Sequence, residues 1–583
     1  MGLEQVISFK GYAVDYSFLC EYADSVCFDD FINLISNGSK EIYISRNFKL
    51  FHYCYTHQVD NNNVAISNAM RKFVSATLPN KTLHELQTPN AMSFVHEVSK
   101  LEDVCLITAK NGILFKRLRE KRLVFDFPVL LFDGDDFFFY ENGRECYANV
   151  PEEKVSPLAS RKEYLDSQNF CNVGDVVTTD TNEKLELTKR ISNGAEGMVF
   201  FTDNPKYVAK IYHRGVITPL RWAKLTKMVK KGIVSPEICW PQNLIYLYGV
   251  PVGYTMLIGK GSTLGNVFDG PDAVFNNFPN WTRLEIVETA INIVEKYIYL
   301  HLHDIYVGDI QLKNALIKSE KEVYLIDMDS CQIGNLPCPV GTEEFTSPVL
   351  WGKDFSTFMR TPANEDYCIA MLVFSILFCG LHPYATRLGK ETLREEIIER
   401  NFPYTLDNSD TTHIPVGGYN YIWEYLPDTL RRMLYDVFAL GRTHEAVEWY
   451  DALLEYKKKV LDKSLTDWEA YKVFPKMDYG PTVDKETEKR DTVKSPFTKG
   501  SIRDSVIYAN KDNPFAKAAG VSDSNSSYSN NEKKPSSAYV PKMTQSSYTI
   551  NTANTATKNN VKNDTQADKK KKGLFSKIFN NED

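Results

Sequence analysis

Two short motifs in the middle of the chain combine residue types that suit the binding of a phosphorylated ligand. The first is Ile191-Ser-Asn-Gly-Ala-Glu-Gly-Met-Val199, whose glycines allow backbone N–H groups to approach phosphates closely. A plain hairpin turn would use the same glycines. The second, Tyr207-Val-Ala-Lys-Ile211, places Lys210 within an alternating strand. That lysine either faces solvent or reaches beneath the glycine turn toward α- and β-phosphate oxygens.

Two further motifs supply carboxylates and an amide. Gly308-Asp-Ile-Gln-Leu-Lys-Asn314 follows a long amphipathic segment at about 283–301, and Val323-Tyr-Leu-Ile-Asp-Met-Asp329 is a strand that runs into carboxylates. Mg²⁺ prefers oxygen ligands, which Asn314 and Asp327 would supply. Asp309 stands where a base would accept the proton of an attacking hydroxyl. Each motif alone could occur by chance. The spacing Asp-x₄-Asn-x₁₂-Asp, following a glycine turn and a strand lysine in the sequence, is far less expected by chance.

With these motifs, residues 183–460 resemble the protein-kinase fold. The resemblance implies ATP and Mg²⁺ as cofactors, with Ser192 at the usual first glycine of the Gly-rich loop. It makes Lys210 the strand-3 lysine, Asp366 the aspartate of the central C-lobe helix and Arg442 the C-terminal arginine. The implied site residues are catalytic Asp309 and Lys210, nucleotide-binding Ser192, Gly194, Gly197, Val199, Lys210, Met256 and Ile258, and metal-binding Asn314, Asp327 and Asp329.

Several positions depart from the kinase pattern. Val307-Gly308 replaces the usual His-Arg, so no arginine is present there to bind an activation-loop phosphate. Met328-Asp329 replaces Phe-Gly, and Asp329 is either a second metal ligand or a substitute for Asp327, with the spacing favouring Asp327. Val349 replaces the glutamate of A-P-E. Gln311 stands where serine/threonine kinases carry a lysine, which weakens the hydroxyl-substrate assignment.

The largest departure concerns the helix that usually supplies a glutamate to the strand-3 lysine. Thr218–Gly232 has the cap residues of a short helix, but no Asp or Glu occurs from Ile211 to Pro236. Either Glu237 substitutes, or Lys210 pairs with Asp327 or waits for nucleotide. This feature favours a nucleotide-binding pseudokinase scaffold, whereas the presence of lysine, base and metal ligands favours catalysis.

The preferred function is transfer of the ATP γ-phosphoryl group to Ser/Thr hydroxyls of a protein, the chain itself included. The forms G-D-x₄-N and I-D-x-D-S resemble a divergent bacterial kinase group. That group is known from helix-hairpin-helix fusions and from gene clusters with von Willebrand-type and phosphatase proteins. The resemblance therefore implies stress or defence signalling and partners of those kinds.

Residues 1–150 predict a small α/β domain with a mostly parallel sheet, because strands at 41–44, 104–108 and 128–132 alternate with helical stretches. Over about residues 5–135 the order of strands and helices resembles a PIN-like nuclease domain. Asp15 would match its first carboxylate, with Glu41 as a weakly placed companion, but Asn90 and Asn111 stand where further carboxylates are expected. Amides cannot supply the charge of a two-metal site. A degenerate binding or scaffolding domain is therefore preferred to a nuclease regulated by the kinase-like domain, and nucleic-acid binding stays open.

The 583 residues predict a multidomain α+β protein with a formal net charge of −7. The expected order is the N-terminal domain, a linker at 151–182, an N-lobe at 183–258, a C-lobe at 259–460 and a mostly disordered tail at 461–583. Eleven cysteines without a C-x-x-C pair, and the lack of a signal peptide, indicate reduced thiols and a cytoplasmic protein. The basic amphipathic segment 569–579 predicts docking to a partner or peripherally to a membrane.

Overall fold

A computed structural model describes residues 9–36, 38–58, 65–121, 127–132, 137–140, 154–165, 171–233, 235–465 and 469–477. Most of the expected disordered tail, and its basic segment 569–579, lies outside these residues. The beginning of that tail is nevertheless folded, because the short turn η8 (Ala470–Lys472) follows residue 469 and the Arg283 N–H donates to the carbonyl of Lys476 at 3.0 Å. The folded chain therefore continues beyond the expected boundary at residue 461.

The N-terminal domain is built on one six-stranded sheet with the order β3-β2-β1-β4-β5-β6. The first five strands of that order are mutually parallel, and β6 pairs antiparallel with β5. Every residue of β1 and β4 is buried, which is typical of central parallel strands covered on both faces. The expected α/β domain with a mostly parallel sheet is confirmed. Its strands are β1 (Gly11–Val14), β2 (Glu41–Ser45), β3 (Leu83–Leu86), β4 (Val104–Ala109), β5 (Val129–Phe132) and β6 (Phe137–Tyr140).

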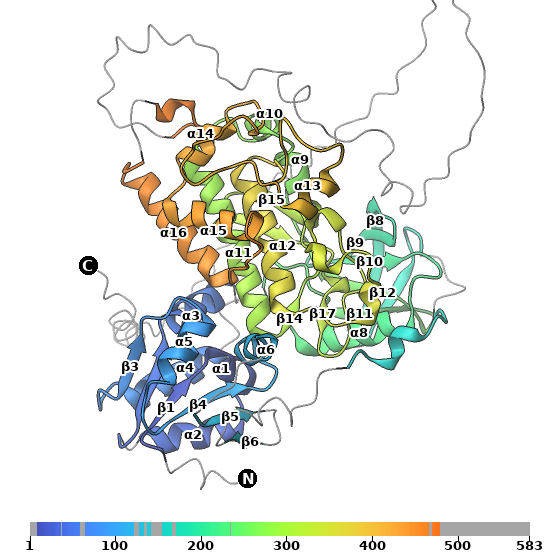
Figure 1. Ribbon diagram of the computed structural model, residues 1–583. Coiled ribbons are helices and arrows are strands. Elements are labelled where there is room, and N and C mark those ends of the chain that lie inside the picture. Colours follow the sequence, from blue (N-terminus) through green and yellow to red (C-terminus); the bar gives the residue numbers. More distant parts are fainter. Residues whose placement is uncertain are drawn as a thin grey trace, which may run out of the picture. The chain divides into compact units, whose positions relative to one another are not determined.

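Helices connect these strands and cover the sheet (Figure 1). Their apolar faces meet the sheet in a core that includes Phe94, Val98 and Leu118, packed against Leu106. The helices are α1 (Tyr16–Tyr22), α2 (Val26–Ser36), α3 (Asn47–Gln58), α4 (Ala65–Thr77), α5 (Ala91–Val98) and α6 (Ile113–Glu120).

A closed barrel of six strands forms the next part of the chain, with the order β10-β12-β11-β7-β8-β9. All neighbouring strands in it are antiparallel. The barrel includes β7, which lies inside the expected linker, so the boundary predicted at residue 183 is too late. Its strands are β7 (Val176–Thr179), β8 (Lys184–Asn193), β9 (Gly197–Thr202), β10 (Tyr207–Tyr212), β11 (Asn243–Leu247) and β12 (Val250–Leu257).

One helix, α8 (Pro219–Lys231), is inserted between β10 and β11. The Thr218 side chain accepts from the N–H of Arg221, and Gly232 ends the helix with a φ of 65°. Only glycine adopts this left-handed conformation without strain, so the helix bounds expected from the cap residues are confirmed.

The remainder is largely helical, and α11 runs through it almost completely buried. It packs against α12 and α16, and Figure 1 shows these helices running side by side. No described helix combines the length and apolar character needed to cross a bilayer. The helices are α9 (Leu264–Val267), α10 (Pro271–Asn277), α11 (Arg283–Leu302), α12 (Pro362–Leu377), α13 (Leu393–Glu399), α14 (Tyr419–Glu424), α15 (Asp428–Phe438) and α16 (Ala446–Leu461).

Five short strands carry the loops that hold the polar motifs. β14 pairs with β17, and β15 pairs with both β13 and β16, in each case antiparallel. The loop from β14 to β15 contains Asp309 and Asn314, and β16 leads into Asp327. The strands are β13 (Ser262–Thr263), β14 (Ile305–Tyr306), β15 (Ala315–Ser319), β16 (Glu322–Leu325) and β17 (Gln332–Ile333).

Candidate active site

The two glycines of the first motif have different surroundings, since Gly194 lies in the turn between β8 and β9 and Gly197 is the first residue of β9. A Cβ atom on Gly197 would lie 2.4 Å from the carbonyl oxygen of Ile211, so the close approach of β9 to β10 requires glycine there. The nearest atom to a Cβ on Gly194 would be 3.5 Å away. Gly197 therefore has a packing reason to be glycine, whereas the space beside Gly194 would admit a side chain. The N–H of Gly194 donates to the carbonyl of Gly197 at 2.8 Å, and the carbonyl of Gly194 lies 2.9 Å from His213 Nε2.

Lys210 points to the two aspartates that follow β16. Its Nζ atom lies 2.8 Å from Asp327 Oδ1 and 2.8 Å from Asp329 Oδ1. The two carboxylates differ in environment, since the side chain of Asp327 is 58% exposed and that of Asp329 only 3% exposed. Burial alone would lower the pKa of Lys210, but the charges of Asp329 and Asp327 outweigh it and hold this pKa above its usual value.

Asp329 is the buried partner of the strand lysine. Besides Lys210, its carboxylate accepts hydrogen bonds from the hydroxyls of Tyr212 and Tyr254, and Arg221 Nη1 lies 3.8 Å away. Burial would raise the pKa of Asp329, but the charges of Lys210 and Arg221 hold it well below its usual range. These donors occupy both oxygens of Asp329, and its expected role as a metal ligand stays a prediction.

The charges of helix α8 are reversed relative to the usual kinase arrangement. Instead of a glutamate paired with the strand lysine, α8 presents Arg221, which makes two hydrogen bonds of 2.6 and 2.7 Å to Glu196 in the glycine turn. Glu237, the other candidate partner of Lys210, pairs with Lys296 at 2.7 Å instead. The buried acid of this ion-pair network therefore comes from Asp329, and α8 contributes its cation.

Asp309 is held by three side chains. Its Oδ1 accepts a hydrogen bond from Thr342 at 2.8 Å, and its Oδ2 accepts from Gln311 at 3.0 Å and from Asn314 at 2.9 Å. Asn314 Nδ2 also donates to the backbone carbonyl of Asp309. These contacts fix the orientation of the carboxylate.

A backbone hydrogen bond connects the loop of Asp309 with the strand that carries Asp327. The N–H of Ile326, directly before Asp327, donates to the carbonyl of Asn314 at 3.0 Å, as β15 and β16 pair from Ala315 onward. Asp327 itself has a φ of 58°, in the left-handed region that non-glycine residues rarely adopt. Lys210, Asp327, Asn314 and Asp309 thus form one connected site.

The backbone directly before Asp309 is held by Glu365 and not by Asp366, the residue that resembles the aspartate of the central C-lobe helix. Glu365 is 1% exposed, and its carboxylate accepts the N–H groups of Val307 at 2.8 Å and Gly308 at 3.0 Å. Asp366 points away and binds Arg117 of the N-terminal domain. Arg442, which lacks the A-P-E glutamate as a partner because Val349 replaces it, lies 3.2 Å from Asp436.

The three apolar residues expected around a nucleotide base gather near the site. Met256 belongs to a buried cluster on the barrel, and Val199 and Ile258 pack against the same cluster. Ser192 lies opposite Val199 in the pairing of β8 with β9. Their contact with a nucleotide stays a prediction.

The polar residues of the N-terminal domain do not assemble as expected. Asp15 follows β1 at the carboxyl edge of the sheet, whereas Glu41 begins β2 and pairs in register with Gly11 at the opposite edge. Glu41 therefore cannot join Asp15, and its expected companion role is wrong. Asn90 caps α5, and Asn111 is exposed after β4.

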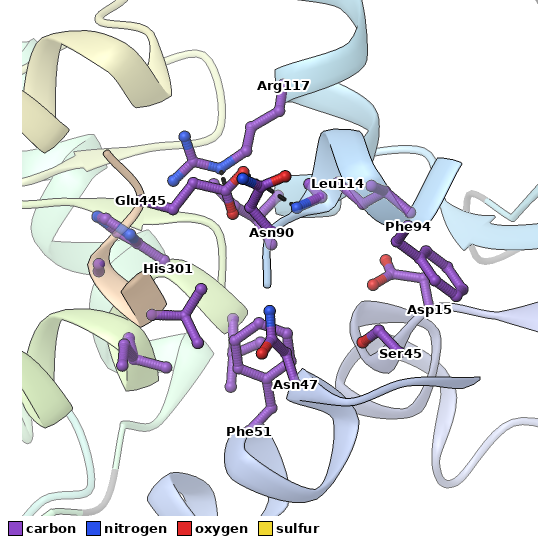
Figure 2. Close-up of a pocket in the computed structure, with 16 residues that line it drawn as sticks. Asp15, Ser45, Asn47, Phe51, Asn90, Phe94, Leu114, Arg117, His301 and Glu445 are labelled. Atoms are coloured by element: carbon purple, nitrogen blue, oxygen red, sulfur yellow. Dashed lines mark hydrogen bonds and ion pairs between the residues drawn. The ribbon is translucent and has the colours of Figure 1, made fainter. Parts of the chain in front are cut away.

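The carboxyl edge of this sheet borders a pocket that is lined by residues of both folded parts. Figure 2 shows Asp15 and Ser45 on one side of it, and His301 and Glu445 on the other. Burial raises the pKa of Asp15, although hydrogen bonds from Ser17 and Thr108 partly offset this. Within the described ranges, no group of three or more His, Cys, Asp or Glu side chains is placed to hold a metal ion.

Comparisons with known proteins agree with the kinase-like motifs. The chain is 29% identical over 252 residues to protein kinase YegI of Escherichia coli K12, covering 40% of the chain and 38% of the relative. It is 25% identical over 151 residues to serine/threonine-protein kinase 1 of Lymantria dispar multicapsid nuclear polyhedrosis virus, covering 25% of the chain and 52% of that protein. No model of a known protein family matches.

A solved structure, a rhoptry kinase from Toxoplasma gondii, aligns with 53% of the chain and 92% of its own length at 10% identity and a TM-score of 0.37. The chain spans about two fifths of the length of YegI. The relatives in sequence are protein kinases, and this supports a kinase-like family for the matched part of the chain.

Sequence reasoning missed four residues that support the site, of which only Glu196 lies inside one of its motifs. They were missed because their partners are distant in sequence or because a neighbouring residue matched the kinase pattern better. Two features of the sequence could have predicted the contact of Arg221 with Asp329. They are the basic character of the helix at 218–232 and the second aspartate of the I-D-x-D segment. The missed supporting residues are Glu196, Arg221, Thr342 and Glu365.

Proposed function

We propose that the part of the chain from about residue 171 to 477 transfers the γ-phosphoryl group of ATP to a serine or threonine hydroxyl of a protein. The observation that carries this proposal is the connected set of Lys210, Asp327, Asn314 and Asp309, joined by contacts of 2.8 to 3.0 Å. Residues of three motifs far apart in sequence meet in it. The similarity to protein kinases supports the same activity.

The donor set fits a magnesium ion. Asp327 is largely exposed, so its carboxylate is accessible to a ligand beyond its contact with Lys210. Asn314 donates through Nδ2 to Asp309, an arrangement that leaves its Oδ1 directed elsewhere as an oxygen donor. Asn314 and Asp327 would hold the ion, and Asp329, with its oxygens already occupied, is left out of the set. When bound, the ion would neutralise charge on the phosphate oxygens.

The side chains of the chain would then bind and orient the reactants. Lys210 would contact phosphate oxygens, and the glycine turn between β8 and β9 would lie over the phosphates. Asp309 would orient the acceptor hydroxyl and accept its proton as the bond from the hydroxyl oxygen to the γ-phosphorus forms. The bond to the bridging oxygen breaks at the same time and ADP leaves.

Autophosphorylation in Mg²⁺-ATP, followed by mass spectrometry of the intact chain and of its peptides, tests the proposal. Added mass of one phosphate or more on wild type, none on Asp309→Ala, and modified Ser or Thr in the peptides are expected. The Asp309→Ala variant should retain ATP binding, because Lys210 and the glycine turn are unchanged. ATP binding without transfer to the chain or to added protein substrates would instead favour the pseudokinase scaffold.

The cellular setting proposed from the bacterial resemblance is stress or defence signalling in the cytoplasm. Proteins of the von Willebrand and phosphatase classes are the proposed partners, and segment 569–579 is the proposed docking element. Purification of the tagged chain from its native cells with and without residues 569–583 tests both. Loss of the same partners on truncation is expected, and unchanged recovery would contradict the docking role.

A further inference from the structure

Helix α6 of the N-terminal domain contacts the kinase-like part at two places that flank its catalytic loop. Arg117 makes hydrogen bonds of 2.6 and 3.0 Å to the two oxygens of Asp366 on α12. The preceding residue of α6, Lys116, forms an ion pair with Asp304, which directly precedes β14 and the loop of Asp309. One short helix therefore reaches both the start of the loop and the helix that supports it.

The contact with Asp366 is adjacent to the residue that fixes the catalytic loop. Asp366 follows Glu365, whose carboxylate accepts the backbone N–H groups of Val307 and Gly308. Because the two acids are consecutive in one helix, a shift of the first turn of α12 moves both. The N–H of Gly308 is only one residue from Asp309, so such a shift would displace the proposed base.

A second contact from α6 holds the beginning of α12. Glu120 accepts hydrogen bonds from the hydroxyl of Thr361 at 2.6 Å and from the N–H of Ala363 at 3.3 Å. Thr361 is the N-cap residue of α12, and Ala363 lies in its first turn, where backbone N–H groups have no partner within the helix. The N-terminal domain therefore stabilises the turn that carries Glu365.

Burial indicates that the Arg117–Asp366 pair is more than a surface contact. The side chains of Arg117 and Asp366 are 9% and 2% exposed, and the geometry is a paired fork of guanidinium and carboxylate. By contrast, the ion pair of Arg46 with Asp451 joins the same two parts of the chain with side chains that are 46% and 28% exposed. It contacts α16 and not the catalytic loop.

We propose that Arg117 is a positioning residue for phosphoryl transfer, which acts through Asp366 and Glu365 on the backbone of the loop that carries Asp309. In this proposal, contacts from the N-terminal domain hold the loop of Asp309 in the kinase-like part in position. This inference rests on the proposed function for its kinetic consequence, but its structural consequence at Val307 and Gly308 is independent of catalysis.

The experiment compares the full chain with Arg117→Ala, Arg117→Lys, Glu120→Gln and Arg46→Ala by kinetics and by amide hydrogen exchange. Arg117→Ala should lower kcat by roughly 10- to 100-fold, with KM for ATP changed by less than about twofold, because loop geometry and not the nucleotide contacts is altered. Exchange at Val307 and Gly308 should become faster. Arg117→Lys should recover part of both losses.

Arg46→Ala is the matched control, because it removes a contact between the same parts without reaching the loop. It should leave kcat and the exchange of Val307 and Gly308 as in wild type. The inference is overturned if Arg117→Ala leaves both readouts unchanged, or if Arg46→Ala lowers them equally. Should Arg117→Ala fail to fold, Glu120→Gln decides, with faster exchange at the same two amides expected.

The two proposals fail in different ways. A wild type that transfers no phosphate contradicts the proposed function. In that case the amide exchange of Val307 and Gly308, compared between Arg117→Ala and wild type, still tests the positioning role of Arg117. If wild type transfers phosphate and Arg117→Ala has the same kcat and the same amide exchange, only the positioning role of Arg117 is contradicted.

Discussion

Asp327 and Asp329 lie at equal distances from Lys210, and replacing each with asparagine should have opposite consequences. Asp329→Asn removes a carboxylate that is 3% exposed and that accepts from Lys210, Tyr212 and Tyr254. Asp327→Asn removes one that is 58% exposed. The structure therefore predicts that the first change mainly destabilises the fold and that the second mainly abolishes phosphoryl transfer.

The magnitudes follow from burial. Breaking a buried ion pair by removing one partner costs about 3–5 kcal/mol, because the remaining charge is left in a poorly solvated place. Lys210 keeps Asp327 as a second partner, so about 3 kcal/mol is expected for Asp329→Asn. An exposed ion pair contributes about 0–1 kcal/mol, which is the range expected for Asp327→Asn.

The assay is urea unfolding of both variants and wild type, monitored in parallel with transfer of phosphate from ATP. A double-mutant cycle with Lys210→Met isolates each contact. We expect a coupling of about 1–3 kcal/mol for Lys210 with Asp329, and one below about 0.5 kcal/mol for Lys210 with Asp327. If Asp327→Asn destabilises as much as Asp329→Asn, or if the couplings are reversed, the assignment of the buried partner is wrong.

Other consequences concern the turn, the loop and a buried histidine. Gly197→Ala should destabilise the barrel by roughly 2 kcal/mol in thermal unfolding, since its Cβ would meet the Ile211 carbonyl, whereas Gly194→Ala should leave the melting temperature nearly unchanged. Glu365→Gln should speed amide exchange of the catalytic loop, and unchanged exchange would contradict its holding role. Burial lowers the pKa of His382 in the folded chain to about 4, from its usual value of 6.5. As pH falls below 6.5, His382 is therefore protonated in the unfolded chain before it is protonated in the folded chain, and this favours unfolding. About 2 kcal/mol of stability should be lost by pH 5, and His382→Asn should flatten this part of the pH profile.

Local patterns were sufficient where one segment determines its own structure. Thr218, Pro219 and Gly232 predicted both ends of α8, because caps and a left-handed glycine depend on neighbours in sequence. The parallel sheet of the N-terminal domain followed from alternating strands and helices. The motifs around Lys210, Asp309 and Asp327 were likewise sufficient to predict one shared site.

Prediction failed where the outcome depended on register or on contacts between distant segments. The sequence predicts correctly that Glu41 begins a strand, but it does not show at which edge of the sheet Glu41 lies. Only the pairing with Gly11 places Glu41 at the edge opposite Asp15. Glu365 and Asp366 are adjacent acids, and only the packing of α12 against α6 and β14 decides which of them holds the catalytic loop. A single sequence does not contain that information locally.

The reversed charges around α8 bear on whether the missing glutamate prevents catalysis. In the usual arrangement, that glutamate orients the strand lysine and links the helix to the site. Here Asp329 orients Lys210, while Arg221 links α8 to Glu196 in the glycine turn and approaches Asp329. Both tasks are therefore carried out by other residues, and the lack of an acid in α8 is no argument for a pseudokinase.

The contact of Arg221 in α8 with Glu196 in the glycine turn can be tested by its effect on ATP binding. If Arg221 replaces the link that a glutamate usually provides, Arg221→Met should weaken ATP binding through the loosened glycine turn, while Glu196→Gln should give a smaller loss of the same kind. A Glu196→Gln/Arg221→Met double variant should be no worse than Arg221→Met alone, because both changes break one contact. Strictly additive losses in the dissociation constant for ATP would mean that the two residues act separately and that α8 is not linked to the turn in this way.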